Sequence, residues 1–218
     1  MTPLLVTLEA LDVQIALVDA KLETLCAEEP VVTRLTTTPG VGLLVAAAFV
    51  SVIDDAKRFR DAHQVASSLG LVPCEDSSGG RTRHRLGAIS KQGNSYLRSL
   101  LVQGAWTLLR TGQSEDPLRT WARTVIERRG KRIAIVALAR RLSAVLWAMW
   151  RDGTVYDAAR VGAAIARGLD RRAQSTEVQA DALRRAASKA RERERERTKV
   201  LGSAASARQA QPRRSATA

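Results

Sequence analysis

The sequence predicts an all-α protein: a coiled-coil arm, then a compact multi-helix domain, then a disordered or solvated basic tail. Hydrophobic residues make up 45% of the 218 residues but aromatic residues only 4%, so the core must consist mainly of Leu, Val, Ile and Ala. Apolar residues recur at helical spacing, and the alternating runs typical of strands are scarce. We expect the arm at 1–30, the domain at 31–155 and the tail at 156–218.

The charge balance indicates a polyanionic partner. Lys and Arg total 35 against 22 Asp and Glu, which gives a formal net charge of +13. Because so much positive charge opposes compaction, it usually meets a polyanion. Nucleic acid is the leading candidate, and an anionic membrane surface is the weaker one.

Other classes of protein are not favoured by the sequence. The two cysteines and two histidines lack the spacing of a zinc site, and isolated cysteines fit a reducing cytosol. No apolar run reaches the roughly 18 residues of a membrane span, and no signal peptide is evident. We therefore expect a cytoplasmic, nucleoid-associated protein that does not enter a membrane.

The first segment carries a heptad seam. Its apolar residues alternate steps of four and three along three repeats, which is the pattern of a coiled coil. The helix either packs on its own domain or pairs subunits, and the second alternative predicts a homo-oligomer formed through 4–25. The seam consists of Leu4, Leu8, Leu11, Ile15, Val18, Leu22 and Leu25.

A glycine-containing turn follows the arm, in the sequence Thr-Pro-Gly-Val-Gly at 38–42. A helix is expected after it, from Leu43 to Ile53. The turn resembles that of helix-hairpin-helix modules, in which Gly40 and Gly42 would let backbone amides approach a phosphate beside the helix N-terminus. Pro-Gly turns between helices are also common without any such role, so both interpretations stay open.

Helix-start and helix-stop signals divide the rest of the domain. Asp61 with Gln64 three residues later indicates a capping box, and Gly70 suits the end of that helix. Composition predicts a loop from 77 to 87. Further helices are expected at about Lys91 to Arg110, Asp116 to Gly130 and Lys131 to Trp150.

A stretch without acidic residues runs from 77 to 114. The alternating Arg81, Arg83 and Arg85 would hold three guanidinium groups close together on a loop, which suits phosphate binding. In the predicted helix that follows, Lys91, Asn94 and Arg98 share one face. A solvated surface would mix charges of both signs, so this stretch favours contact with nucleic acid. Its cations are Arg81, Arg83, Arg85, Lys91, Arg98 and Arg110.

Ser77 and Ser78 stand before two glycines inside this basic loop. A serine hydroxyl needs a base or nearby cations before it can attack a phosphate. From the residues alone, the Ser-Ser-Gly-Gly segment is either a turn or a nucleophile.

Six motifs between Pro39 and Trp106 occur in the order found in a known family. They are Thr-Pro-Gly-Val-Gly (38–42), Arg-Phe (58–59), Leu-Gly-Leu-Val-Pro (69–73), Ser-Ser-Gly-Gly (77–80), Ile-Ser-Lys-Gln-Gly-Asn (89–94) and Leu-Arg-Ser-Leu-Leu (97–101). This stretch resembles the C-terminal transposase domain of insertion-sequence family 110 and its 116, 902 and 1111 relatives, whose recombination is guided by a bridge RNA. A weaker likeness continues through Arg-Gly-Lys at 129–131 to Trp150.

The resemblance implies a function and a nucleophile. It places the nucleophile of DNA strand exchange at Ser78, with Ser77 as the alternative. It also implies a guide RNA, a coiled coil, and Mg²⁺ bound by four carboxylates of an N-terminal domain that we expect to be missing from this chain. Independent catalysis is then not expected.

The leading hypothesis is therefore DNA transposition. The alternatives are a non-catalytic binding module for DNA or RNA and a homo-oligomeric scaffold. The run of alternating Arg and Glu at 191–197 is either a solvated segment or a further nucleic-acid contact. The expected nucleic-acid contacts are Gly40, Gly42, Ser77, Gly79, Arg81, Arg83, Arg85, Lys91, Asn94, Arg98 and Lys131.

Overall fold

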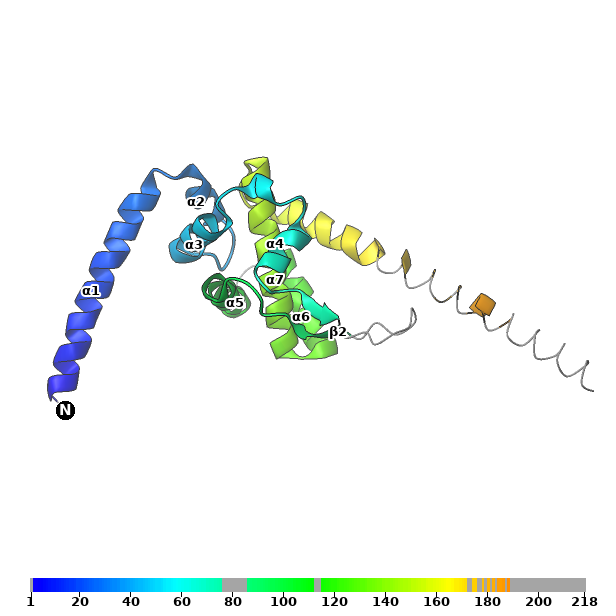
Figure 1. Cartoon of the computed structure of the whole chain (residues 1–218), viewed down its shortest axis with the longest axis horizontal. Helices are drawn as coiled ribbons and strands as arrows, with labels where there is room; N and C mark the ends of the chain where they lie inside the picture. Colours follow the sequence, from blue (N-terminus) through cyan, green and yellow to red (C-terminus); the bar gives the residue numbers. More distant parts are fainter. Residues whose placement is uncertain are drawn as a thin grey trace, which may run out of the picture. The chain divides into compact units, whose positions relative to one another are not determined.

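The computed structural model describes residues 2–75, 86–111 and 115–171, and then residues 174, 175, 178, 180, 182, 184–186 and 188. Most of these residues are helical, which confirms the predicted all-α class (Figure 1). The chain divides into two units, Met1–Ile165 and Ala166–Ala218. The helices are α1 (Thr2–Ala27), α2 (Pro30–Leu35), α3 (Leu43–Ile53), η1 (Ala56–Arg58), α4 (Ala62–Ser68), α5 (Ser95–Arg110), α6 (Pro117–Arg129) and α7 (Lys131–Asp152).

The core of the first unit is built around α7. Helices α2, α4, α5 and α6 and the short η1 all pack against it, and Figure 1 shows α7 among these elements. Leu138, Leu142 and Leu146 are fully buried along its length. The Trp147 indole Nε1 donates a hydrogen bond of 2.9 Å to the carbonyl oxygen of Ala56, which ties η1 to the same helix.

Helix α7 is also long and apolar enough to cross a membrane by length and composition, alone among the described helices. This differs from the sequence-based expectation that no stretch would reach that length. Half of the apolar window is buried inside the domain, because its Leu, Ile and Ala side chains face the surrounding helices. The helix has the packing of a core helix.

Helix α1 leaves its apolar side chains exposed within the single chain. Leu11 and Val18 of the seam are 53% and 65% exposed. Only the last turns touch the domain, where Cys26 is buried and Leu22 is partly buried. Of the two interpretations of this helix, packing on its own domain holds only near its C-terminal end, and subunit pairing stays a prediction.

The predicted capping box at α4 is present in a modified form. The Asp61 carboxylate accepts a hydrogen bond of 2.9 Å from the Gln64 backbone N–H, as expected for an N-cap. The Gln64 side chain accepts one of 2.8 Å from the N–H of Arg60, one residue before the cap. The reciprocal bond of a capping box is therefore displaced by one residue.

A small antiparallel hairpin interrupts the helices. Strands β1 (Pro73–Glu75) and β2 (Leu86–Ile89) pair with Pro73 opposite Ile89 and Glu75 opposite Leu86. The sequence had predicted a loop through Gly87, which lies within β2. The strands are too short to show an alternating apolar pattern, so the sequence alone did not reveal them. Their pairing depends on contacts between residues that are separated in sequence.

The first unit continues beyond the boundary predicted at 155. Residues 158–171 are helical, Ile165 is buried, and a Cβ added at Gly162 would meet the Pro117 side chain at 3.5 Å. The sequence signal missed this because Ala, Arg and Gly dominate both sides of the boundary. In the second unit, the described residues up to 188 are helical and nearly all exposed, and the Arg-Glu run at 191–197 lies outside the described residues.

Candidate nucleic-acid interface

The hairpin brings together the two ends of the segment that carries the predicted nucleophile. Residues 76–85 join β1 to β2, and Glu75 and Leu86 at their ends are paired across the strands. The segment itself lies outside the described residues, so the structure does not place six of the predicted site residues. These are Ser77, Ser78, Gly79, Arg81, Arg83 and Arg85.

Two glycines lock the base of this hairpin against the end of α4. Gly70 and Gly93 have positive φ angles of 67° and 122°. A Cβ added at Gly93 would lie 2.0 Å from the Ser68 carbonyl oxygen, and one at Gly70 would lie 2.4 Å from that of Gln92. Any larger residue would push the two backbone segments apart. The glycines thus fix where both ends of the 76–85 segment leave the domain.

The residues after β2 do not share a helical face as predicted. Helix α5 starts at Ser95, because the Asn94 side chain accepts a hydrogen bond of 2.9 Å from the Leu97 N–H and acts as its N-cap. Lys91 therefore precedes the helix, with a φ of 56°. Its N–H donates a hydrogen bond of 3.1 Å to the Gly70 carbonyl. The predicted helix start at Lys91 was wrong, because Asn94 caps the helix and the helical residues begin only after it.

Lys91 and Arg98 differ in the surroundings of their charges. The Lys91 side chain is exposed at the base of the hairpin. Arg98 is partly buried, and its Nη1 donates a hydrogen bond of 3.0 Å to the Leu69 carbonyl at the end of α4. Arg98 therefore holds α5 to α4, and Lys91 is the cation of this pair that faces solvent.

The Thr-Pro-Gly-Val-Gly turn is placed differently at its two glycines. Gly40 has a φ of 80°, and a Cβ there would lie 2.5 Å from the Gly104 carbonyl oxygen of α5. Its lack of a side chain is thus required by close packing of the turn on α5. Gly42 is exposed at the N-cap of α3, with open space where a Cβ would stand. Only Gly42 has the open surroundings that a phosphate contact needs.

Lys131 lies at the turn between α6 and α7. Its Nζ stands 4.7 Å from the ring centroid of Trp106, which is a cation–π contact. Exposed cations flank it on both sides of Gly130. Sequence reasoning selected Lys131 alone and missed Trp106, although the run Arg-Arg-Gly-Lys-Arg at 128–132 is visible in the sequence.

The described residues show few perturbed carboxylates. A hydrogen bond from the Gln64 backbone N–H lowers the pKa of Asp61, and the bond from Arg151 lowers the pKa of Asp152. Both carboxylates serve local structure, as a helix cap and an ion pair. Within the part of the chain that is described, no group of three or more His, Cys, Asp or Glu side chains could hold a metal ion.

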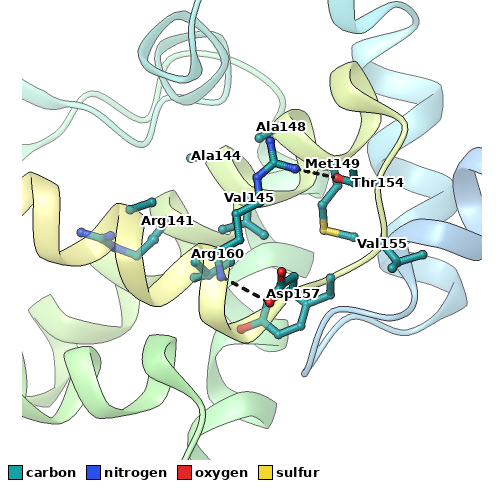
Figure 2. A pocket seen from close by; sticks show the side chains of 12 residues that line it. Arg141, Ala144, Val145, Ala148, Met149, Thr154, Val155, Asp157 and Arg160 are labelled. Carbon is teal, nitrogen blue, oxygen red and sulfur yellow. Dashed lines mark hydrogen bonds between the residues drawn. The ribbon is translucent and has the colours of Figure 1, made fainter.

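A cavity of about 200 Å³ lies between α7 and residues 154–164 (Figure 2). Its walls are mainly apolar, from Val145, Ala148 and Met149 on one side and Val161 on the other. The Arg160 guanidinium donates to Thr154 Oγ1 at 3.4 Å, and its backbone N–H donates to Asp157 Oδ1 at 3.3 Å. These two hydrogen bonds connect Arg160 to Thr154 and Asp157 at the polar part of the lining.

A polar contact closes the first unit next to this cavity. The Tyr156 hydroxyl donates a hydrogen bond to the buried Asp116 carboxylate, which also caps α6 by accepting from the Leu118 N–H at 2.8 Å. Burial, with the Asp116 carboxylate as the second cause, raises the pKa of Tyr156 well above its usual range. The Tyr156 N–H donates to Thr37 Oγ1 at 3.0 Å. This residue therefore connects three parts of the domain.

Comparisons with known proteins identify the segment that contains the hairpin. Residues 32–119 match the model of the Transposase IS116/IS110/IS902 family. The chain is 35% identical over 150 residues to a probable family 20 transposase of Pseudomonas aeruginosa, covering 68% of this chain and 44% of that protein. It is 39% identical over 117 residues to the transposase for insertion sequence element IS1111A of Coxiella burnetii, covering 53% and 32%.

A third relative matches over a similar length. The insertion element IS110 uncharacterized 43.6 kDa protein of Streptomyces coelicolor is 33% identical over 156 residues, covering 69% of this chain and 36% of that protein. The chain thus spans less than half the length of each of these three relatives. The matched segment begins within α2 and includes α3 to α5 and both strands of the hairpin. Together with these relatives, it shows that this chain belongs to the IS116/IS110/IS902 family of transposases.

Proposed function

We propose that this chain acts in DNA transposition, as the part of an insertion-sequence transposase that holds DNA and supplies a serine nucleophile. The family match over 32–119 carries the proposal, because it spans the hairpin and the Ser-Ser-Gly-Gly segment between its strands. The net charge of +13 supports a nucleic-acid substrate. The protein would act in the cytoplasm, where a bacterial chromosome is accessible.

The proposed chemistry is a phosphoryl transfer to Ser78. The Ser78 oxygen attacks the phosphorus of a scissile phosphodiester, a serine–phosphate bond forms, and the bond to one deoxyribose oxygen breaks. The serine proton passes to a base, and the departing sugar oxygen takes up a proton. Attack by a second DNA end on the same phosphorus would release the serine. Arg81, Arg83 and Arg85 are proposed to stabilise the charge on the phosphate.

Three further parts of the proposal concern partners. Mg²⁺ is proposed to bind carboxylates outside this chain. A guide RNA is proposed as a second polyanion on the basic surface. A second copy of the chain is proposed to pair through residues 4–25, where the apolar seam of α1 is exposed in the single chain.

The test is the formation of a covalent protein–DNA adduct. The part of the Pseudomonas aeruginosa relative that lies outside its matched segment would be fused to this chain. The fusion would be mixed with Mg²⁺, that element's labelled DNA ends and RNA transcribed from its flanks. A denaturing gel then reports any adduct that resists boiling. We expect an adduct with the fusion and none with this chain alone, since a serine alkoxide is scarce at neutral pH without a base or metal.

Serine variants locate the nucleophile. Ser78→Ala should abolish the adduct while DNA retention in a gel-shift assay stays within a few-fold, because the cations are intact. Ser77→Ala is the matched control and should leave most of the adduct. Loss with Ser77→Ala alone would move the nucleophile by one residue, and an adduct insensitive to both changes would refute the serine mechanism. A non-catalytic binding module would retain DNA and form no adduct in any variant.

A further inference from the structure

A cluster of cations occupies the corner where α6 turns into α7. Five basic side chains lie within ten residues there, and Glu127 is the one acidic residue among them. All five are exposed. We call this surface the basic corner, and it consists of Arg123, Arg128, Arg129, Lys131 and Arg132.

The charges of the basic corner are not neutralised within the described part of the chain. None of its five cations forms an ion pair within 4.0 Å with a described carboxylate. Exposed arginines elsewhere do form such pairs: Arg58 with Asp54 at 3.4 Å and Arg160 with Asp152 at 2.6 Å. The domain thus pairs some exposed arginines with carboxylates and leaves the basic corner with four excess positive charges.

The backbone beneath the basic corner is held in place. Trp121 and Val125 of α6 and Ala134 and Leu138 of α7 are buried next to the turn. Gly130 makes the turn with a φ of 82°, and its N–H donates a hydrogen bond of 2.8 Å to the Ile126 carbonyl. The cations are therefore presented on two packed helices, so little ordering of the backbone is needed when a ligand binds.

The electrostatics of α7 favour an anion at this corner. Its first turn carries Lys131 and Arg132 and no acidic residue, and no side chain caps its N-terminus. Cations at the positive end of a helix dipole are unfavourable, whereas anions there are stabilised. A phosphate placed at the corner would be attracted by the side chains and by the helix end together.

The burial of the aromatic rings near the basic corner favours a duplex over single-stranded nucleic acid. Single-stranded nucleic acid is usually held by aromatic rings on which bases stack. Of the aromatic rings near this corner, Trp121 is buried, and Trp106 is partly buried with the Lys131 amine over it. Arg123 and Arg128 lie about 7.5 Å apart along α6 and about 140° apart around it, so the cations of the basic corner spread around this end of the helix.

We propose that the basic corner binds the phosphate backbone of double-stranded DNA, as a contact separate from the 76–85 segment. The choice of DNA rests on the proposed function in transposition, whose substrate is a DNA duplex. Phosphate contacts of this kind position a protein on a duplex and carry no sequence information. The basic corner would therefore hold DNA of any sequence.

The test compares two triple variants of the full chain. Arg128→Gln, Arg129→Gln and Arg132→Gln together remove three cations of the basic corner. Lys57→Gln, Arg58→Gln and Arg60→Gln are the matched control, since they remove three exposed cations that lie among Asp54, Asp55 and Asp61. Binding to a 30-base-pair duplex of random sequence is measured by fluorescence anisotropy over a range of salt concentrations. A structured RNA of equal length is the second probe.

Loss of three phosphate contacts should flatten the log–log salt dependence by about 2 to 3 for DNA. The control should change it by less than about 1. Replacing the same three arginines by lysine should restore the slope, because the charges return. Melting temperatures of all variants should match the wild type, because these side chains stay exposed when the chain folds.

Four results would overturn the proposal. Equal slopes for the two Gln triples would mean that only total charge matters. An effect confined to RNA would assign the corner to RNA. The slope of the salt dependence could be flattened by Arg81→Ala, Arg83→Ala and Arg85→Ala together but not by the corner triple. That result would leave the proposed function standing and refute DNA binding by the basic corner. A wild-type chain that binds no DNA at low salt would instead refute the DNA contact of the proposed function, and this inference with it.

Discussion

Asn94 has a structural role that its predicted contact with nucleic acid did not include. Its side chain caps α5, and the nucleic-acid contact stays a prediction. Asn94→Ala should lower the free energy of unfolding by about 1 kcal/mol, since the Leu97 N–H loses its partner. Asn94→Asp should keep stability within a few tenths of a kcal/mol, because Asp caps about as well. Urea denaturation measures both, and an unchanged midpoint for Asn94→Ala would contradict the capping role.

The raised pKa of Tyr156 predicts that the domain loses stability at alkaline pH. Its pKa is raised in the folded state, so the folded chain keeps the phenol proton where the unfolded chain loses it. This contribution to stability is complete below about pH 10, the pKa of an unfolded tyrosine, and declines as pH rises further. Tyr156→Phe should cost about 2 kcal/mol at neutral pH, because the buried Asp116 carboxylate loses a donor.

The comparison of the two proteins by urea denaturation at pH 7 and at alkaline pH checks this. The stability difference between wild type and Tyr156→Phe should narrow as pH rises above about 10. A difference that stays constant or widens would contradict the role of the phenol proton. Tyr96→Phe is the control, because that tyrosine is exposed and should show no such effect.

At the scale of elements, α1 carries the most specific expectation. Leu11→Asp with Val18→Asp places two charges in the seam, and burying them unpaired would cost several kcal/mol. We expect the wild type to be dimeric or larger in light scattering and the double variant to be a monomer. Ala16→Asp with Thr24→Asp, which lie off the seam, should leave the oligomer intact. A wild-type monomer would refute the self-pairing arm.

The sequence predicted elements well where local signals suffice. Asp61, Asp116 and Gly153 lie at helix ends in the structure, because caps depend on residues within one turn. It failed where distant contacts decide. The close approach of Gly40 to Gly104 of α5 is one such contact, because spacing cannot reveal this partner; the phosphate contact of Gly40 stays a prediction. The hairpin was missed for the same reason.

The candidate site also combines features that local sequence signals predicted with features that only the fold reveals. Lys131 was selected from a motif, but the exposure of its basic neighbours and the cation–π contact with Trp106 required the fold. Lys91 was expected on a helix and lies before it, since Asn94 acts as a cap. The roles of Ser78 and the three arginines between the strands stay predictions, because those residues lie outside the described part of the chain.

For the whole molecule, the net charge of +13 leads to a prediction about salt. The purified chain should bind duplex DNA and structured RNA, with a log–log slope of affinity against salt of about −5 if roughly six phosphates are neutralised. Arg81→Ala, Arg83→Ala and Arg85→Ala together should flatten that slope by about 2 to 3. Anisotropy titrations measure it, and a slope near zero would contradict electrostatic binding.

The central position of α7 has a consequence for folding during synthesis on the ribosome. Helices α2, α4 and α5 bury their apolar sides against α7, which leaves the ribosome after all of them. During synthesis, at about 5–20 residues per second, Leu35, Val65 and Leu101 wait for several seconds without the surface that covers them. The nascent chain therefore passes through a stage in which apolar side chains of these helices are uncovered, until Asp152 has emerged. A stalled or truncated chain that ends before α7 would have no finished core.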